Sequence, residues 1–187
     1  MKNEQVIWPK VMLASYKYLG ALCNTIDRLV EKTAKNSIHT SSVWSNSCSV
    51  MNVSYKIMEL SNKKIDYINL KIIIEKTLKN MSIKHSKILV LRFMHQLSIE
   101  EIANLLKISQ RTVYRKMDEA LASMIKIMKQ QGYSIEYIEI NYSKDTFISS
   151  VYESIRAYQS NVNTICNTFN NDELFNKYLH NFALKFA

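Results

Sequence analysis

Glycine and proline are almost missing from this sequence, whose 187 residues contain two Gly and one Pro. Tight turns need residues that accept positive φ angles or reverse the chain, and β-meanders need many such turns. The scarcity therefore favours a mostly all-α protein, a helical bundle with few sharp corners. It also excludes a glycine-rich phosphate-binding loop, because Gly20 and Gly132 are the only glycines.

Cysteines and long apolar runs are also scarce. The three cysteines (Cys23, Cys48 and Cys166) are far apart, which excludes a disulfide framework or a cysteine zinc site and favours reduced thiols in the cytoplasm. The first 16 residues lack the apolar core of a signal peptide. The longest apolar stretches span only a few residues, too few to cross a bilayer. We expect a cytoplasmic protein with no membrane partner.

Residues for catalysis or metal binding do not cluster in the sequence. The four histidines show no ligand spacing with Cys or acidic residues, and no nucleophile stands beside a base. Glu100 and Glu101 are adjacent, so on a helix they point to different sides and do not form a catalytic pair. We expect no catalytic residues, no metal and no cofactor, which disfavours enzymes such as a recombinase.

Positive charge is abundant, and it is concentrated in one part of the chain. The net charge is +9, although only five residues are Arg. Residues 84–132 contain nine basic and four acidic residues, which is +5 of that total. A basic excess of this kind favours a polyanionic partner, either a nucleic acid or an anionic membrane face. A solvated, lysine-rich surface would give the same total charge.

The N-terminal part of the sequence predicts a helix followed by a linker. Apolar residues recur at three- and four-residue steps in residues 11–35, and their stripe predicts either packing within the domain or a dimer seam (Leu19, Leu22, Ile26, Leu29 and Val30). Residues 36–49 are rich in Ser, Thr and Asn and predict a loop, with Trp44 as an isolated anchor. We therefore predict that residues 1–49 form an N-terminal helix and polar linker.

Helical periodicity returns over residues 53–131, so we predict a helical domain at 50–132 and a C-terminal extension at 133–187. Within the extension, apolar and polar residues alternate over 133–142, which predicts a short strand that must pair or else be a helix. Helices are expected at 146–158 and 172–186, with a loose Asn-rich stretch between them. The last helix has an apolar stripe that predicts either a partner interface or a cap on the domain (Leu174, Phe175, Tyr178, Leu179, Phe182 and Phe186).

Residues 99–118 have the pattern of a helix-turn-helix. Ser98 and Glu101 form a capping box, the small Ala103 allows two helices to cross closely, and Ile108 fills the turn. Ser109 is a second N-cap, and the helix after it has apolar residues on its inner face (Val113, Met117, Ala120, Leu121 and Met124). A plain helical hairpin would share the apolar spacing, but these signals together favour DNA binding.

The outer face of the second helix has the side chains for reading DNA. Arg presents a two-pronged donor to guanine, and Gln pairs with adenine. The outward stripe consists of Gln110, Arg111, Tyr114, Arg115 and Asp118. Ser109, Thr112 and Lys116 are placed to meet phosphates. The predicted DNA-binding residues are therefore Ser109, Gln110, Arg111, Thr112, Tyr114, Arg115 and Lys116.

Residues 72–131 resemble region four of bacterial sigma factors. The motifs that carry this resemblance are Leu91-Arg92-Phe93, Leu97-Ser98, Glu101-Ile102-Ala103, Ile108-Ser109 and Thr112-Val113-Tyr114-Arg115-Lys116. The resemblance implies that DNA is contacted by Ser109, Gln110, Arg111, Thr112, Arg115 and Lys116. Lys107 stands where the family usually has Gly, often at a positive φ, so we expect either some strain or a slightly different turn there. The first 80 residues lack the signature of sigma region two.

The arrangement of segments is similar to phage and mobile-element regulators of the ArpU and RinA kind. We therefore predict a sequence-specific transcription regulator that binds double-stranded DNA. One alternative is a divergent sigma factor with RNA polymerase as its partner. Another is a protein-interaction module whose basic face meets an acidic partner. A homodimer is expected because helix-turn-helix proteins often bind paired half-sites.

Overall fold

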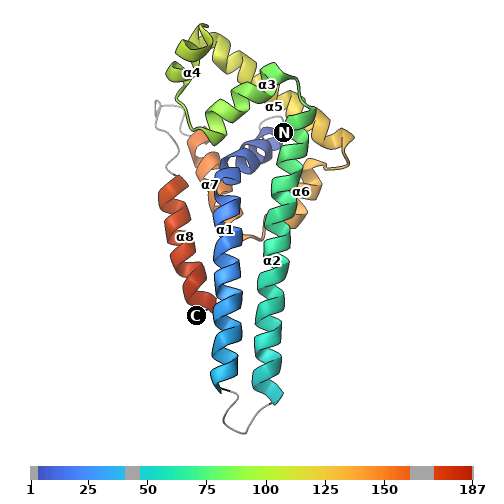
Figure 1. Ribbon diagram of the computed structural model, residues 1–187. Helices are drawn as coiled ribbons and strands as arrows, with labels where there is room; N and C mark the ends of the chain where they lie inside the picture. The colour runs from blue at the N-terminus through green and yellow to red at the C-terminus, as the bar shows by residue number, and fades with distance from the viewer. Residues whose placement is uncertain (1–3, 41–46, 161–170, 187) are drawn as a thin grey trace.

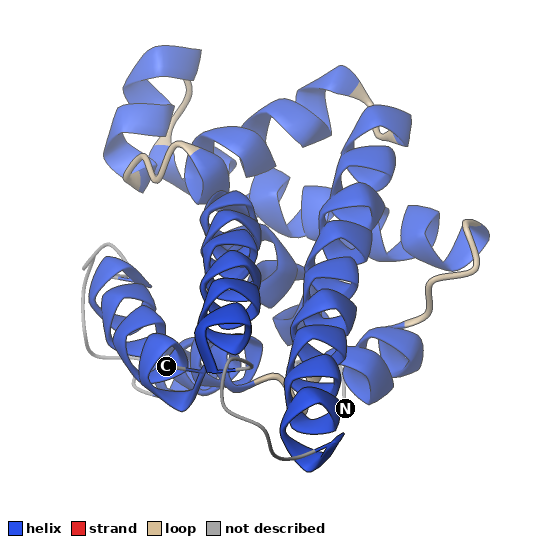
Figure 2. Ribbon diagram, turned by 60° about the horizontal axis from the view of Figure 1, so that its bottom comes forward, coloured by secondary structure: helices blue, strands red, loops and turns tan. Residues whose placement is uncertain are grey.

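The computed structural model describes residues 4–40, 47–160 and 171–186, and over this part of the chain every regular element is helical (Figures 1 and 2). The predicted all-α class is confirmed. In chain order the elements are α1 (Glu4–Thr40), α2 (Ser47–Asn80), α3 (Ile83–Leu89), the π-helical turn η1 (Val90–Met94), α4 (Ile99–Leu106), α5 (Gln110–Gln130), α6 (Ile135–Tyr142), α7 (Thr146–Ser160) and α8 (Asn171–Phe186).

The two longest helices, α1 and α2, form an antiparallel hairpin, and α3, η1, α4 and α5 gather at its upper end (Figure 1). The predicted stripe on α1 lies inside this fold, because Leu19, Leu22 and Ile26 are each at most 1% exposed. Packing within the domain is therefore the correct interpretation of that stripe, and a dimer seam there is wrong. The predicted linker is also shorter than expected, since α1 extends to Thr40 and α2 begins at Ser47. Trp44 lies outside the described residues.

The strand expected at residues 133–142 is wrong, because this segment forms α6. Ser134 caps the helix by accepting a hydrogen bond from the backbone N–H of Tyr137 at 3.2 Å. Ile138 and Tyr142 are buried one helical turn apart, whereas Ile140 between them is 73% exposed. The apolar residues therefore follow a helical period, and their apparent alternation is a coincidence of a short segment.

Helix α8 folds back onto the core. Phe175 lies 4.6 Å from Tyr18 between ring centroids, Tyr178 lies 5.3 Å from Phe147, and Phe182 is 5% exposed. At the start of α8, Asp172 accepts hydrogen bonds from the Tyr18 hydroxyl at 2.7 Å and the Lys17 ammonium at 3.1 Å. These described side chains cap the domain, so of the two interpretations of the C-terminal stripe the contacts support the cap. The side chains of Leu174 and Phe186 lie outside the described set.

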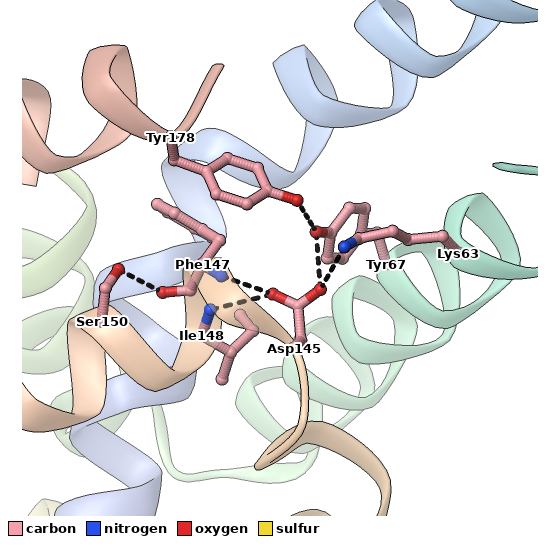
Figure 3. Close-up of polar contacts among 7 residues, drawn as sticks. All are labelled: Lys63, Tyr67, Asp145, Phe147, Ile148, Ser150 and Tyr178. Carbon is pink, nitrogen blue, oxygen red and sulfur yellow. Dashed lines mark hydrogen bonds and ion pairs between the residues drawn. The ribbon is translucent and has the colours of Figure 1, made fainter. Parts of the chain in front are cut away.

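A polar cluster around Asp145 connects α2, α7 and α8 (Figure 3). One carboxylate oxygen of Asp145 accepts hydrogen bonds from the backbone N–H groups of Phe147 and Ile148, both at 2.9 Å, and thereby caps α7. The other oxygen lies 3.1 Å from the Lys63 ammonium and accepts a hydrogen bond from the Tyr67 hydroxyl at 2.8 Å. Burial raises the pKa of Tyr67, so its hydroxyl stays protonated as a donor. The Tyr178 hydroxyl completes the cluster at 3.0 Å from that of Tyr67.

Candidate nucleic-acid interface

The first helix of the predicted helix-turn-helix, α4, begins with the expected capping box. The Ser98 hydroxyl accepts a hydrogen bond from the Glu101 N–H at 3.1 Å, and the Glu101 carboxylate accepts one from the Ser98 N–H at 2.7 Å. The hydrogen bonds from Ser98 hold the pKa of Glu101 below its usual value. Two N–H groups that the helix itself cannot satisfy are thus paired, which fixes where α4 begins.

The turn between α4 and α5 depends on Lys107. Its backbone is left-handed, with φ 53° and ψ 46°, as the sequence predicted for a position where the related family has Gly. This conformation costs a residue with a Cβ about 1–2 kcal/mol. The next residue, Ile108, is partly buried against the core, and its N–H donates to the Ala103 carbonyl at 3.0 Å. Packing of Ile108 helps to stabilise the strained turn.

The two helices cross through a small apolar contact zone. Ile102 and Val113 are fully buried and Ala103 is 6% exposed. Farther along α5, Ala120, Leu121 and Met124 are also fully buried, and Met117 is partly buried. The predicted inner face of both helices is therefore confirmed. Tight packing of this kind fixes the orientation of the opposite face of α5.

Sequence reasoning missed the role of Arg92. Its guanidinium donates a hydrogen bond to the Leu97 carbonyl at 2.8 Å, across the turn that follows η1. This turn includes Gln96, the second residue other than Gly with a positive φ (57°) among those described. The motif Leu91-Arg92-Phe93 marked the position, but the partner is a backbone atom that only the folded turn brings near. Arg92 thus positions α4 from within the protein.

The N-terminal half of α5 presents the predicted DNA-binding residues on its outer side. Tyr114 is 47% exposed and the Arg115 side chain 71%. The exposed group is completed by Ser109, Gln110 and Arg111, while Thr112 and Lys116 are half-buried. All seven predicted residues thus lie at the start of one helix, and none is fully buried.

Hydrogen bonds within this surface involve mainly Ser109 and Thr112. The Ser109 hydroxyl accepts from the Thr112 N–H at 3.2 Å, as predicted for an N-cap, and lies 2.8 Å from the Thr112 hydroxyl. Arg115 lies 3.8 Å from Glu119, a distance that leaves an exposed pair weak. Within the part of the chain described, Arg111 makes no hydrogen bond or ion pair. Its five donors can therefore engage a ligand without breaking a contact.

Sequence reasoning also missed Lys10, a basic residue of α1 that is affected by the charge of Asp118 at the far end of the outward stripe. The charge of Asp118 acts on Lys10, whose pKa is lowered by burial and partly restored by this carboxylate. Lys10 comes from α1, more than a hundred residues earlier, and no local pattern indicates the pairing. The charge of Asp118 is therefore felt by a lysine of the protein's own first helix.

These features define α4 and α5 as a helix-turn-helix of the DNA-binding kind. Residues 77–124 match the family model described as Sigma-70, region 4, and this segment is a sigma region four-like helix-turn-helix. The match covers roughly a quarter of the chain. Comparisons with curated proteins and with solved structures give no match. The similarity in layout to ArpU and RinA regulators stays a prediction.

Among the described residues, this surface is accompanied by neither a membrane span nor a metal cluster. In these ranges, no helix combines the length and apolar character needed to cross a membrane. No three His, Cys, Asp or Glu side chains within residues 4–40, 47–160 and 171–186 lie close enough together to hold a metal ion.

Proposed function

We propose that this protein is a sequence-specific regulator of transcription that binds double-stranded DNA through α5. The observation that carries the proposal is the exposed polar face of α5, with Arg111 and Arg115, on a helix whose opposite face is fully buried in a sigma region four-like unit. A rigid helix of this kind fits the major groove, where base edges are distinguishable.

Each predicted residue has a role in this binding mode. Arg111 and Arg115 pair with guanines, Gln110 pairs with adenine, and Tyr114 lies between them on the same face. Ser109, Thr112 and Lys116 contact phosphates, assisted by the backbone N–H groups at the start of α5. Helix α4 crosses the DNA backbone above the groove, where its packing against α5 sets the angle of entry.

The test is selection of bound duplexes from a random pool, followed by sequencing. A sequence-specific protein enriches one motif, and the enriched duplex outcompetes unrelated DNA. Enrichment of no motif, with equal binding to all duplexes, contradicts the proposal. Failure to bind any duplex favours instead a protein-interaction module that uses the basic face.

A second candidate function is that of a divergent sigma factor, and the family match favours it because region four domains bind RNA polymerase as well as DNA. The two functions differ in whether the purified chain binds core polymerase and directs initiation from a promoter. Co-sedimentation with core polymerase and run-off transcription on the selected motif distinguish them. If core polymerase initiates at the promoter when this chain is the only added factor, the chain is a sigma factor.

A further inference from the structure

Helix α2 has a second apolar face that points away from its own core. Its inner face, with Leu60, Tyr67, Leu70 and Ile74, is at most 1% exposed. Seven other large apolar side chains of the same helix are 39–64% exposed, namely Val50, Met51, Tyr55, Met58, Ile65, Ile68 and Ile72. A surface helix of a globular protein needs one apolar face. The outer face of α2 thus lacks the neighbour that its composition requires.

The outer face has the spacing of a coiled coil. Met51, Tyr55, Met58, Asn62, Ile65, Asn69 and Ile72 follow one another at alternating steps of four and three residues. These residues span three heptads, and such a repeat keeps one stripe of a helix facing a partner helix. We call this stripe the seam. At 1.5 Å per residue the seam is about 32 Å long. It ends before Lys76 and Lys79.

The two asparagines in the seam indicate a second copy of this chain as the partner. Asn62 and Asn69 are exposed and occupy the same heptad position, seven residues apart. An Asn amide carries both a donor and an acceptor, so it is satisfied by the identical residue across a two-fold axis. Both asparagines occupy the a position of the heptad. In parallel two-stranded coiled coils, Asn at an a position fixes the register and the number of chains.

The size of the face is sufficient for a specific dimer. Six of these apolar side chains lie in the seam or directly beside it, and about half of their surface, at on the order of 150–200 Å² each, gives roughly 500 Å² per copy. A pair of copies would bury about 1,000 Å², the minimum expected of a specific interface. In Figure 1, α2 has α1 on one side and α6 beside its upper part, and α8 lies on the far side of α1. The Tyr142 hydroxyl at the end of α6 donates to the Asp66 carbonyl of α2 at 3.3 Å, and the outer-face residues of α2 still remain 39–64% exposed.

We propose that α2 pairs with α2 of a second copy, parallel and in register, with Met51, Met58, Ile65 and Ile72 in the seam and each Asn facing its counterpart. Helix α3 begins at Ile83, directly after α2 ends at Asn80. Parallel pairing therefore places both helix-turn-helix units at the same end of the dimer. The interface itself does not depend on DNA binding, so it is tested separately from the proposed function.

The first test is the mass of the full-length chain in sedimentation experiments over a wide concentration range. The double variant Ile65→Glu, Ile72→Glu places like charges in the seam and is expected to weaken the dimer on the order of a hundredfold. The matched control is Ile140→Glu, because Ile140 is 73% exposed on α6, away from the seam. Circular dichroism should show unchanged helix content in both variants.

The proposal is supported if the wild-type chain and the Ile140→Glu control are dimers and the Ile65→Glu, Ile72→Glu variant is a monomer. A wild-type chain that is a monomer at every concentration overturns it, as does a seam variant that stays dimeric. The register is tested with Asn62→Cys in a chain whose natural cysteines are replaced by alanine. Mild oxidation should link two copies through this position, whereas Asn24→Cys, an exposed position on α1, should not link them. A seam-dependent dimer without the Asn62→Cys link overturns parallel pairing.

Discussion

Adjacent residues of α5 lie in opposite environments. Val113 is fully buried at the crossing with α4, whereas Tyr114 beside it is 47% exposed. The N-caps Ser98 and Ser109 were predictable because each depends on neighbours only a few residues away, and strain at Lys107 was expected from its place where the resembling family has Gly. The roles of Arg92 and Lys10 were not, since their partners come from the folded turn and from a distant helix. Folding and DNA recognition can therefore be tested separately on this helix.

The proposed base contacts predict the effect of removing each arginine from the outward face. Arg111→Ala and Arg115→Ala should each weaken binding to the selected motif by about 1–3 kcal/mol and change non-specific binding less. The matched control is Arg156→Ala, because the Arg156 side chain is 63% exposed on α7. Fluorescence anisotropy with specific and unrelated duplexes measures both affinities. Equal losses on all sequences would assign the two arginines to phosphates.

Burial of Val113 predicts that a charge there unfolds the helix-turn-helix. Val113→Asp places an unpaired carboxylate at a site with no exposed surface and should lower the free energy of unfolding by roughly 3–5 kcal/mol. Tyr114→Asp, one residue along, should leave the melting temperature nearly unchanged. Thermal melts followed by circular dichroism compare the two. Equal melting temperatures would contradict the packing of α4 on α5.

The capping box predicts a pH dependence. The pKa of Glu101 is lowered on folding by the hydrogen bonds with Ser98, so the bond stabilises the fold above the usual carboxyl pKa. That stability is lost as the pH falls through the lowered pKa. Glu101→Gln should therefore reduce the fall in melting temperature on acidification, relative to Glu100→Gln on the same turn. A wild-type acid profile in the Glu101 variant would contradict this.

At the scale of elements, the sequence predicts periodic segments well and their partners poorly. The amphipathic pattern located α7 and α8, but it left α6 open between a strand and a helix because eight residues fit either period. That α8 packs on the core depends on Tyr18, Tyr67 and Phe147, which come from three distant parts of the chain. The division at residues 49 and 132 stays a prediction.

The packing of α8 predicts that its loss weakens the whole fold. Deleting residues 171–187 would expose Phe147, which is fully buried against Phe175 and Tyr178. The truncated chain should melt at a lower temperature than the wild type. The control Tyr178→Phe removes one hydroxyl and should lower the free energy of unfolding by only about 1 kcal/mol, so its melting temperature should fall considerably less. Differential scanning calorimetry measures both. Truncation without a change in melting would show that α8 is dispensable for the core.

At the scale of the molecule, the described residues share a hydrophobic core that runs from Ile7 on α1 to Phe182 on α8, and the helix-turn-helix is part of it. The charge of the molecule was the easiest property to predict from the sequence, because it needs no contacts. The exposed apolar face of α2 was the hardest, since the sequence does not show which apolar face of a helix remains exposed. The net charge of +9 bears directly on how the molecule meets DNA.

Phosphate contacts predict a strong dependence of DNA binding on salt. Each contact releases counterions, so removing one lowers the slope of log affinity against log salt by about 1. Lys116→Gln should show this reduction. Lys35→Gln, an exposed residue that pairs with Glu31 far along α1, should not. Titrations at several salt concentrations give the slopes, and identical slopes for the two variants would remove Lys116 from the phosphate contacts.

The left-handed backbone of Lys107 has a consequence for how this turn could evolve. Glycine would relieve the strain, on the order of 1 kcal/mol, and would raise the melting temperature of the unit. It would also delete an exposed positive charge between α4 and α5, the two helices that approach DNA in the proposed binding mode. A glycine at this position should therefore raise the melting temperature and, in that binding mode, weaken the electrostatic attraction to DNA.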